Sequence, residues 1–310
     1  MQQVLHLKPL FQERIWGGTR LQSVFGYPIP SNHTGECWAI SGRDGHSNVI
    51  LNGPLKQKTL RDVYRDYPAL FGNPKSTEFP LLTKIIDATD DLSVQVHPDD
   101  AYARRHGIDS GKSECWLVLD AEKDAKIIYG HTAKTKAEMV ARIQKNEWNE
   151  LLCEKKVSKG DFFDVPAGVI HALGKGILIL ETQQSSDTTY RLFDYHRIDA
   201  FGKSRDLHLE EAIAVSTIPH QELAIQPKER VVGLDRFTTY VDNEYFTVEK
   251  WEIHHTYSKV MDSYLLLSVL EGECVIQGTP YHRGDHLVIT THEGILSLEG
   301  HCVLLTSRPK

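Results

Sequence analysis

A chain of 310 residues, 40% hydrophobic and 25% charged, is long enough to bury a large core and has the composition of an ordinary soluble globular protein. Its 42 acidic and 35 basic residues give a formal net charge of −7 without a dense Lys/Arg segment, so neither a nucleic acid nor an anionic membrane is an expected partner. The first nine residues lack a signal-peptide pattern, and no stretch approaches the roughly 20 apolar residues of a membrane helix. We expect a cytoplasmic protein that is a monomer or a weak homo-oligomer, with its five scattered cysteines reduced.

Short apolar segments bounded by Gly, Pro, Asn and Asp dominate the first two thirds of the chain. Regular alternation of strand and turn patterns favours a sandwich or a barrel. The expected strands cover residues 37–41, 48–51, 81–86, 92–96, 114–119, 126–129, 162–165 and 176–182.

Helical periodicity is confined to a few segments that interrupt this pattern. In one of them Thr135 and Glu138 have the spacing of a capping box. The expected helices cover residues 60–70, 99–106, 135–152 and 207–215. We predict that these helices are insertions covering one end of a barrel.

A polar, proline-containing segment, 217–230, is the expected boundary between a larger domain, 1–230, and a smaller domain, 231–310. Residues 268–276 and 284–289 repeat the apolar pattern found near Gly160. Counted from Gly284, however, the positions of a proline, a glycine and a histidine in the first copy hold Thr290, His292 and Ile295. We expect a second β domain of related architecture without metal ligands.

The first copy of this pattern is the segment 160–172, which contains Gly160, Pro166, Gly168 and His171. Residues 162–165 form the expected strand, and the Pro-x-Gly pair predicts a tight turn where no central ladder bond is needed. His171 then opens the next strand. A histidine held at a rigid strand entrance is a good candidate for a metal ligand.

Three further candidate ligands lie upstream. Gln95 and His97 are two residues apart, so their side chains share one face of a strand. Glu114 completes a set of two imidazoles, one carboxylate and one amide. This mixed nitrogen and oxygen shell suits Zn²⁺ or a similar divalent transition ion in a catalytic role.

The ordered motifs resemble the type I mannose-6-phosphate isomerases, also called phosphomannose isomerases, of the cupin superfamily, in their short bacterial branch. The segments that carry the resemblance are 10–18, 35–38, 95–99, 112–114 and 166–171. It implies a mainly β fold, with a cupin-type β-barrel (jelly roll), inserted helices and a second, degenerate cupin-like domain. It also implies one zinc ion per chain, held by Gln95, His97, Glu114 and His171, and interconversion of mannose 6-phosphate and fructose 6-phosphate through a cis-enediol.

The same resemblance suggests catalytic roles for Lys84, Lys112, Glu181 and Arg191. A lysine inside an apolar strand, such as Lys84, seldom lies in a core without a partner or a function. Burial beside a cation predicts a lowered pKa for Lys84, which with Glu181 is our candidate for proton transfer. Arg191 is expected to stabilise the enediolate or orient the sugar.

Structural alternatives remain open for these four residues and their neighbours. Arg191 could form a surface ion pair with Asp187 or Asp194. Lys112 could be a solvated lysine in a loop. Glu181 could simply be the ion-pair partner of Arg191 or Lys84. Thr189, Arg191 and Phe193 are expected on one strand face. The aromatic residues and glycines near the N-terminus, together with the segment 36–38, are assigned to packing and turns first.

Cupin folds support other functions, so three alternatives stay open. An iron-dependent dioxygenase usually pairs its histidines as His-x-His, whereas this chain has Gln95-Val96-His97. A non-catalytic sugar-binding protein has no evident need of all the candidate residues. A related isomerase acting on another phosphorylated sugar is the third alternative.

Overall fold

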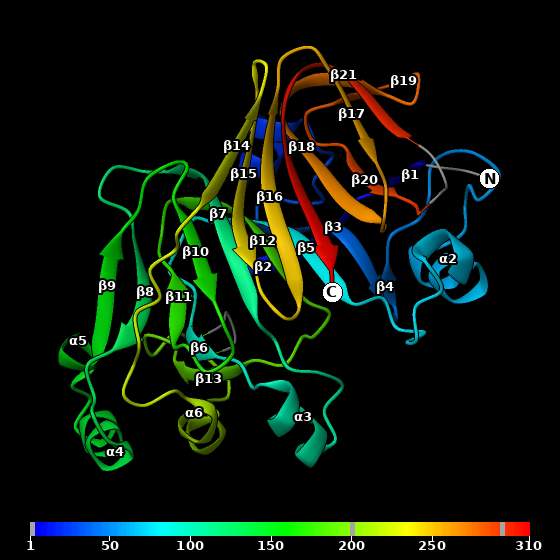
Figure 1. The fold of residues 1–310 in the computed structure, drawn as a ribbon. Coiled ribbons are helices and arrows are strands. Elements are labelled where there is room, and N and C mark those ends of the chain that lie inside the picture. The colour runs from blue at the N-terminus through cyan, green and yellow to red at the C-terminus, as the bar shows by residue number, and fades with distance from the viewer. Residues whose placement is uncertain (1–3, 199–201, 292–294) are drawn as a thin grey trace.

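The computed structural model describes residues 4–198, 202–291 and 295–310, and its named strands form three antiparallel sheets. Figure 1 shows helices α3, α4, α5 and α6 at the lower end, next to the strands of the five-stranded sheet, and the C-terminal strands above them. The expectation of a mainly β chain with inserted helices is confirmed. Among the described residues, no helix is both long and apolar enough to cross a membrane.

The seven-stranded sheet lies in the middle of the molecule, and its central strands are buried on both faces. Its strand order is β10-β7-β12-β5-β3-β2, and β4 pairs with β3. Every residue of β5 and β12 is buried, which explains why these strands are apolar or uncharged at most positions rather than alternating. The strands are β2 (Leu10–Gly18), β3 (Thr34–Arg43), β4 (His46–Ser47), β5 (Leu81–Ala88), β7 (Glu114–Ala121), β10 (Phe162–Val165) and β12 (Ile177–Gln184).

The five-stranded sheet packs against one face of the seven-stranded sheet. Its strand order is β13-β6-β11-β8-β9. Trp116 and Ile179 of one sheet and Ile127 and Leu173 of the other belong to one buried apolar cluster. The strands are β6 (Val94–Val96), β8 (Lys126–His131), β9 (Leu152–Lys156), β11 (His171–Leu173) and β13 (Tyr190–Phe193).

The nine-stranded sheet covers the opposite face of the seven-stranded sheet. Its order is β1-β20-β18-β21-β16-β15-β14, with β17 on β21 and β19 on β18. Leu178 and Leu180 share a buried cluster with Leu266 and Leu305 of this sheet. The strands are β1 (Val4–Leu7), β14 (Lys228–Val232), β15 (Asp235–Asp242), β16 (Phe246–Ile253), β17 (Thr256–Val260), β18 (Leu265–Ile276), β19 (Thr279–His282), β20 (His286–Ile289) and β21 (Ile295–Pro309). Because β1 pairs with β20 and β14 with β15, this sheet contains residues on both sides of the predicted boundary at residue 230, which remains a prediction.

The helices follow the sequence prediction only where no turn-forming residue interrupts them. Asp99 caps α3 (Asp100–His106) and Thr135 caps α4 (Lys136–Gln144), each accepting a backbone N–H bond. The predicted helix 135–152 is divided because Asn146 has φ 55°, and α5 (Trp148–Leu151) follows as a separate turn. Helix α6 is Leu209–Val215, close to the prediction.

Two other local predictions are corrected by the structure, and one helix was missed. The segment 60–70 forms α2 (Leu60–Asp66) and then a 3₁₀ turn, Pro68–Phe71, because a proline cannot continue the α-helix. The segment 48–51 contains only isolated bridges at Val49 and Ile50. Helix α1 (Arg20–Phe25) was not predicted.

The described part of the C-terminal repeat contains no equivalent of the first metal motif. Thr290 is fully buried, Ile295 opens β21 and is exposed, and His292 lies outside the described residues. Across the described chain, the only group of His, Cys, Asp and Glu side chains placed to hold a metal lies elsewhere. The five cysteines are free.

Candidate metal centre and active-site cavity

His97, Glu114 and His171 come together although they are up to 74 positions apart. His97 follows β6, Glu114 opens β7 and His171 opens β11. The turn between β10 and β11 carries the chain from the seven-stranded to the five-stranded sheet, because β10 pairs with β7 and β11 with β6. One ligand atom from each of these three residues lies within 4.8 Å of the others, and all three are buried.

Backbone carbonyls fix the orientation of both imidazoles. His97 Nδ1 lies 2.8 Å from Thr188 O, and His171 Nδ1 lies 2.9 Å from Val169 O. A carbonyl oxygen only accepts hydrogen bonds, so each Nδ1 carries the proton and each Nε2 keeps its lone pair. Such a second contact is typical of histidines that bind metal through the other nitrogen.

The two Nε2 atoms face the Glu114 carboxylate. His97 Nε2 lies 3.4 Å from Oε2, and His171 Nε2 lies 3.3 Å from Oε1. The Gln95 amide lies 3.3 Å from His171 Nε2, and Gln95 pairs directly with His171 across β6 and β11. The four predicted ligands therefore lie together.

The protonation state and donor set fit a divalent cation. Burial lowers the pKa of His171 to about 4 and the pKa of His97 well below its usual value, so both rings are neutral at neutral pH. The Lys112 ammonium lies 3.1 Å from His97 Nε2 and also donates to Glu114 Oε2. Two neutral imidazoles, one carboxylate and one amide can hold Zn²⁺ or a related ion.

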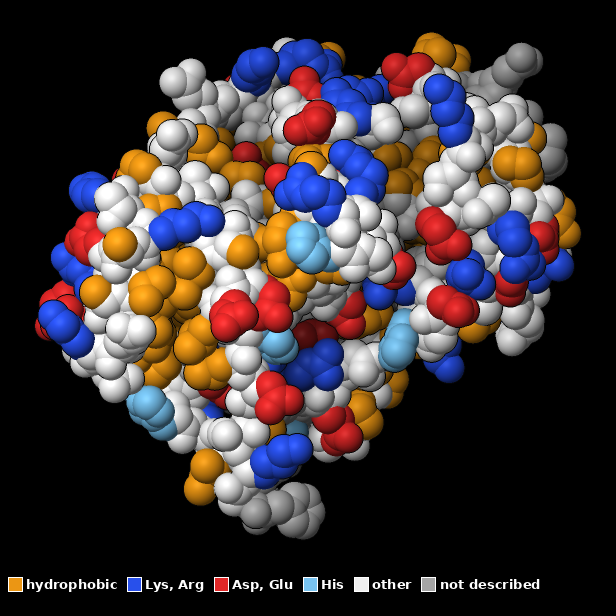
Figure 2. All heavy atoms as spheres, turned by 90° about the horizontal axis from the view of Figure 1, so that it is seen from below, with side chains coloured by type: hydrophobic (Ala, Val, Ile, Leu, Met, Phe, Trp, Pro, Cys, Tyr) orange, Lys and Arg blue, Asp and Glu red, His pale blue; other side chains and the backbone are white. Residues whose placement is uncertain are grey.

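A cavity of about 480 Å³ lies beside this group. Gln95 and Lys112, which contact the histidines and Glu114, form part of its wall, as do the other predicted catalytic residues. On the face shown in Figure 2, acidic, basic and histidine side chains gather around a central hollow. The cavity is lined by Arg14, Trp16, Glu36, Lys84, Ile86, Leu92, Ser93, Gln95, Lys112, Glu181, Asp187, Thr189, Arg191 and Arg205.

Lys84 is buried on β5 and paired with an acid. Its Nζ lies 3.4 Å from Glu181 Oε2 on β12 and 5.3 Å from the centre of the Trp38 ring. Burial acts to lower the Lys84 pKa, but the carboxylates of Glu181 and Glu36 outweigh it and the pKa is raised. The sequence prediction of a lowered Lys84 pKa weighed burial and a neighbouring cation but not these two carboxylates, which reverse the direction of the shift in the protein alone.

Arg191 on β13 lies in the cavity wall rather than in a surface ion pair. Its Nε donates to Ser93 Oγ at 3.2 Å and its Nη1 to Asp206 O at 2.8 Å, whereas Arg197 and Arg205 bind the Asp194 carboxylate. Burial lowers the Arg191 pKa, and the charge of Arg205 adds to the effect.

The predicted common face of β13 is only partly observed. Thr189 and Arg191 line the same cavity, whereas Phe193 lines a different one. The pairing with β6 shifts between Arg191 and Phe193, which turns Phe193 away from the face that Arg191 occupies.

Glu36 is a cavity residue that sequence reasoning assigned to packing. Its carboxylate accepts two bonds of 3.0 Å from Arg14 and one of 2.7 Å from Trp38 Nε1. Burial raises the Glu36 pKa, but Lys84 and Arg14 outweigh this and lower it. The segment 35–38 could have indicated this role, because a glutamate inside an apolar strand needs buried partners.

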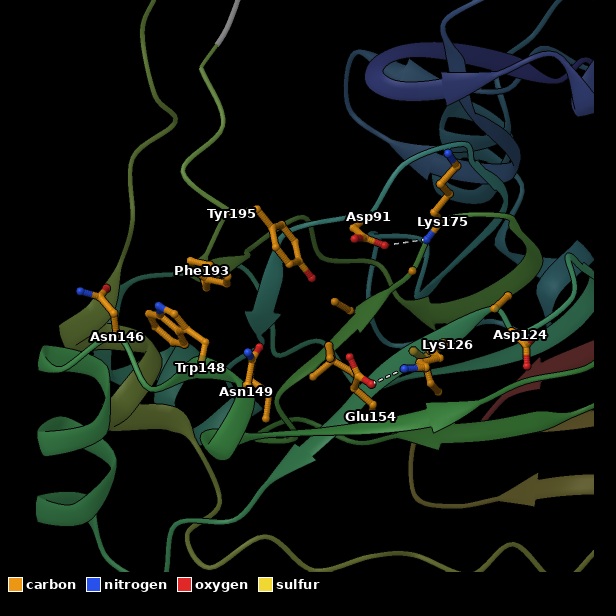
Figure 3. A pocket seen from close by; sticks show the side chains of 16 residues that line it. Asp91, Asp124, Lys126, Asn146, Trp148, Asn149, Glu154, Lys175, Phe193 and Tyr195 are labelled. Carbon is orange, nitrogen blue, oxygen red and sulfur yellow. Dashed lines mark hydrogen bonds and ion pairs between the residues drawn. The ribbon is translucent and has the colours of Figure 1, made fainter.

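A larger cavity of about 1040 Å³ lies on the side of the five-stranded sheet away from these residues. Figure 3 shows Tyr195, Asn149 and Glu154 around it, with Glu154 paired to Lys126. None of the predicted ligands or catalytic residues lines this cavity. The candidate chemistry is therefore confined to the smaller cavity.

Comparison with known proteins places this geometry in a family. Residues 4–113 match the model for the catalytic domain of type I phosphomannose isomerase, and residues 236–309 match the model for the cupin domain of mannose-6-phosphate isomerase. The mannose-6-phosphate isomerase ManA of Bacillus subtilis is 48% identical over 98% of each chain. This chain belongs to the type I phosphomannose isomerase family.

Two further relatives of the family cover nearly the whole chain. The probable mannose-6-phosphate isomerase GmuF of Bacillus subtilis is 47% identical over 98% of this chain and 99% of its own length. A crystal structure of the mannose 6-phosphate isomerase from the same organism superposes with a TM-score of 0.95 at 42% identity, covering 99% of this chain and all of the other. The resemblance predicted from the motifs is thus confirmed.

Proposed function

We propose that this chain is a metal-dependent isomerase that interconverts mannose 6-phosphate and fructose 6-phosphate through a cis-enediol. The observation that carries the proposal is the buried group His97, Glu114 and His171 beside a cavity lined by Lys84 and Arg191. Isomerisation of an aldose to a ketose requires stabilisation of the charge that develops on neighbouring sugar oxygens. A cation site beside the buried Lys84 and the half-buried Arg191 supplies that environment.

The proposed cofactor is one zinc ion per chain, held by Gln95, His97, Glu114 and His171. When bound, zinc supplies Lewis-acid stabilisation worth several kcal/mol to the developing charge. The protein contributes the arrangement of the ligands. Because Gln95 is neutral, the set carries a single carboxylate and leaves net positive charge at the centre.

Glu181 and Lys84 are the proposed proton-transfer pair. Within the described structure, the buried Oε2 of Glu181 has no hydrogen-bond partner, and the Lys84 ammonium lies 3.4 Å away. This oxygen is available to take a proton from C2 and return it to C1. Lys84, held in its protonated form by the neighbouring carboxylates, supplies a proton donor for the sugar oxygens.

Arg191 and Lys112 are proposed to bind and orient the sugar. Arg191 keeps its guanidinium at the cavity wall through Ser93, and Lys112 brings an ammonium next to the ligand group. Fixed positive charges in a buried site stabilise an enediolate more strongly than they do in water. We also propose that the five- and seven-stranded sheets close into the cupin barrel of the larger domain.

A coupled assay for fructose 6-phosphate, run beside metal analysis, tests the function. The purified protein is expected to convert mannose 6-phosphate, to lose activity after treatment with a chelator and to regain it with Zn²⁺. If the chelator leaves the activity unchanged, the reaction does not need a metal and that part of the proposal is wrong. Turnover of a different sugar phosphate in the same assay would instead favour the related isomerase, and oxygen consumption would favour the dioxygenase.

A further inference from the structure

The sequence Glu-x-Trp occurs in three strands of this chain, at 36–38, 114–116 and 249–251. Residues two apart on a strand share a face, so each indole lies next to the carboxylate that precedes it. In every case the indole Nε1 donates to that glutamate, at 2.7, 3.1 and 3.1 Å respectively.

Trp116 differs from the other two tryptophans because its donor is shared by a second acid. Its Nε1 lies 3.1 Å from Glu114 Oε1 and 3.2 Å from Glu181 Oε1 on the neighbouring strand β12. Trp116 pairs directly with Glu181 in the sheet, is 2% exposed, and packs edge-on against the ring of His171. One indole therefore joins the candidate metal ligands to the candidate proton-transfer residue.

We infer that Trp116 is a positioning residue for the proposed isomerase reaction, and the inference rests on that proposed function. Its N–H fixes Oε1 of Glu181, so that Oε2 faces Lys84 and the cavity. Without this donor, Oε1 of Glu181 becomes a buried oxygen without a fixed partner, and the carboxylate turns to find another donor. The position of the oxygen that accepts the substrate proton would then no longer be fixed.

The test compares Trp116→Phe with Trp251→Phe, a matched control. Trp251 is equally buried, donates to Glu249 two residues earlier, and lies in the nine-stranded sheet away from the cavity. Loss of a supporting contact of this kind typically costs about 10- to 100-fold in activity, so kcat of Trp116→Phe is expected to fall in that range. KM is expected to change less than about twofold, because the indole does not bind substrate. Trp251→Phe is expected to keep the wild-type kcat.

A second variant, Trp116→His, separates the lost donor from the lost volume. Its five-membered ring can place an N–H near the position of the indole Nε1, so kcat is expected to recover most of the loss while zinc content stays at one per chain.

The inference is overturned if Trp116→Phe matches Trp251→Phe in kcat, or if Trp116→His is no better than Trp116→Phe. If Trp116→Phe does not fold, Trp116→His decides alone: a zinc-loaded protein with kcat near wild type supports the inference, and a loss of about tenfold or more overturns it. A wild-type protein without isomerase activity overturns the proposed function before any variant is compared.

Discussion

His171 in the five-stranded sheet and His286 in the nine-stranded sheet are equally buried, at 1% and 0% exposure, but their ring nitrogens have different partners. Both nitrogens of His286 meet hydroxyl groups, Ser268 Oγ at 2.8 Å and Tyr27 OH at 2.8 Å. His171 bonds a carbonyl through one nitrogen and directs the other at a carboxylate, 3.3 Å away. Burial therefore does not distinguish a candidate ligand from a structural histidine, whereas the chemistry of the second partner does.

The two copies of the repeated pattern also differ in the path that the chain takes after Gly160 and after Gly284. After Gly160, the turn through Pro166 and Gly168 moves the chain to another sheet and delivers His171 to the site. After Gly284, β20 stays in the nine-stranded sheet, between β18 and β1, and the chain then reaches a buried Thr290. The same local pattern thus builds a candidate metal centre in one region and apolar core in the other.

The largest expected effect is the loss of activity in His171→Ala, with His286→Ala as its comparison. His171→Ala is expected to lose its bound zinc and, with it, about 10²- to 10⁴-fold in turnover, since several kcal/mol of charge stabilisation is lost. His286→Ala is expected to keep zinc and turnover and to lose stability. Metal analysis and the coupled assay check both, and zinc retained by His171→Ala would contradict the assignment.

Substitution of the cavity residues should separate catalysis from metal binding. Lys84→Ala and Arg191→Ala are each expected to keep one zinc per chain and to lose turnover, by about 10²- to 10⁴-fold for a lost proton-transfer partner. Steady-state kinetics on protein of known zinc content measures this. If a variant keeps the wild-type rate, the substituted residue has a structural role and no catalytic one.

A smaller effect is expected in the pH dependence of stability, to which His286 contributes together with His97 and His171. Burial lowers the pKa of His286 to about 3 in the folded protein, against an ordinary value of 6.5. The unfolded chain therefore binds more protons between these values, and the free energy of unfolding falls as the pH decreases from 6.5 toward 3, by about 1.4 kcal/mol per pH unit for one group. Urea unfolding of chelated wild type and His286→Gln at several pH values tests this, because the slope should be smaller by that amount in the variant. Equal slopes would assign the effect to other groups.

The smallest effect is expected for a surface ion pair that joins the two regions. Lys159 Nζ lies 2.8 Å from Glu271 Oε1, and both side chains are more than half exposed. Lys159→Ala should change the free energy of unfolding by less than about 1 kcal/mol, because exposed pairs are screened by water and salt. Chemical unfolding of the two proteins at low and high salt provides the measurement. A clearly larger loss would mean that charge, rather than the buried apolar cluster, couples the sheets.

Local patterns in the sequence are enough to predict the short elements that hold the site. The strand at 162–165 has the predicted bounds, and Thr135 caps its helix as expected, because turn-forming and capping residues act within a few positions. The motifs around His97 and His171 likewise indicate the family without any knowledge of the fold. The local elements depend on spacing along the chain, and the family depends on the resemblance of these motifs to known ones.

Contacts between distant segments decide the remaining features. Local periodicity could not predict that β1 pairs with β20, whose residues lie about 280 positions away, nor that Trp116 lies between Glu114 and Glu181. The sequence suggests that Lys84 is buried, but its raised pKa depends on carboxylates supplied by two neighbouring strands. Electrostatic and hydrogen-bond partners are set by distance in space, so only the packing of the sheets determines them.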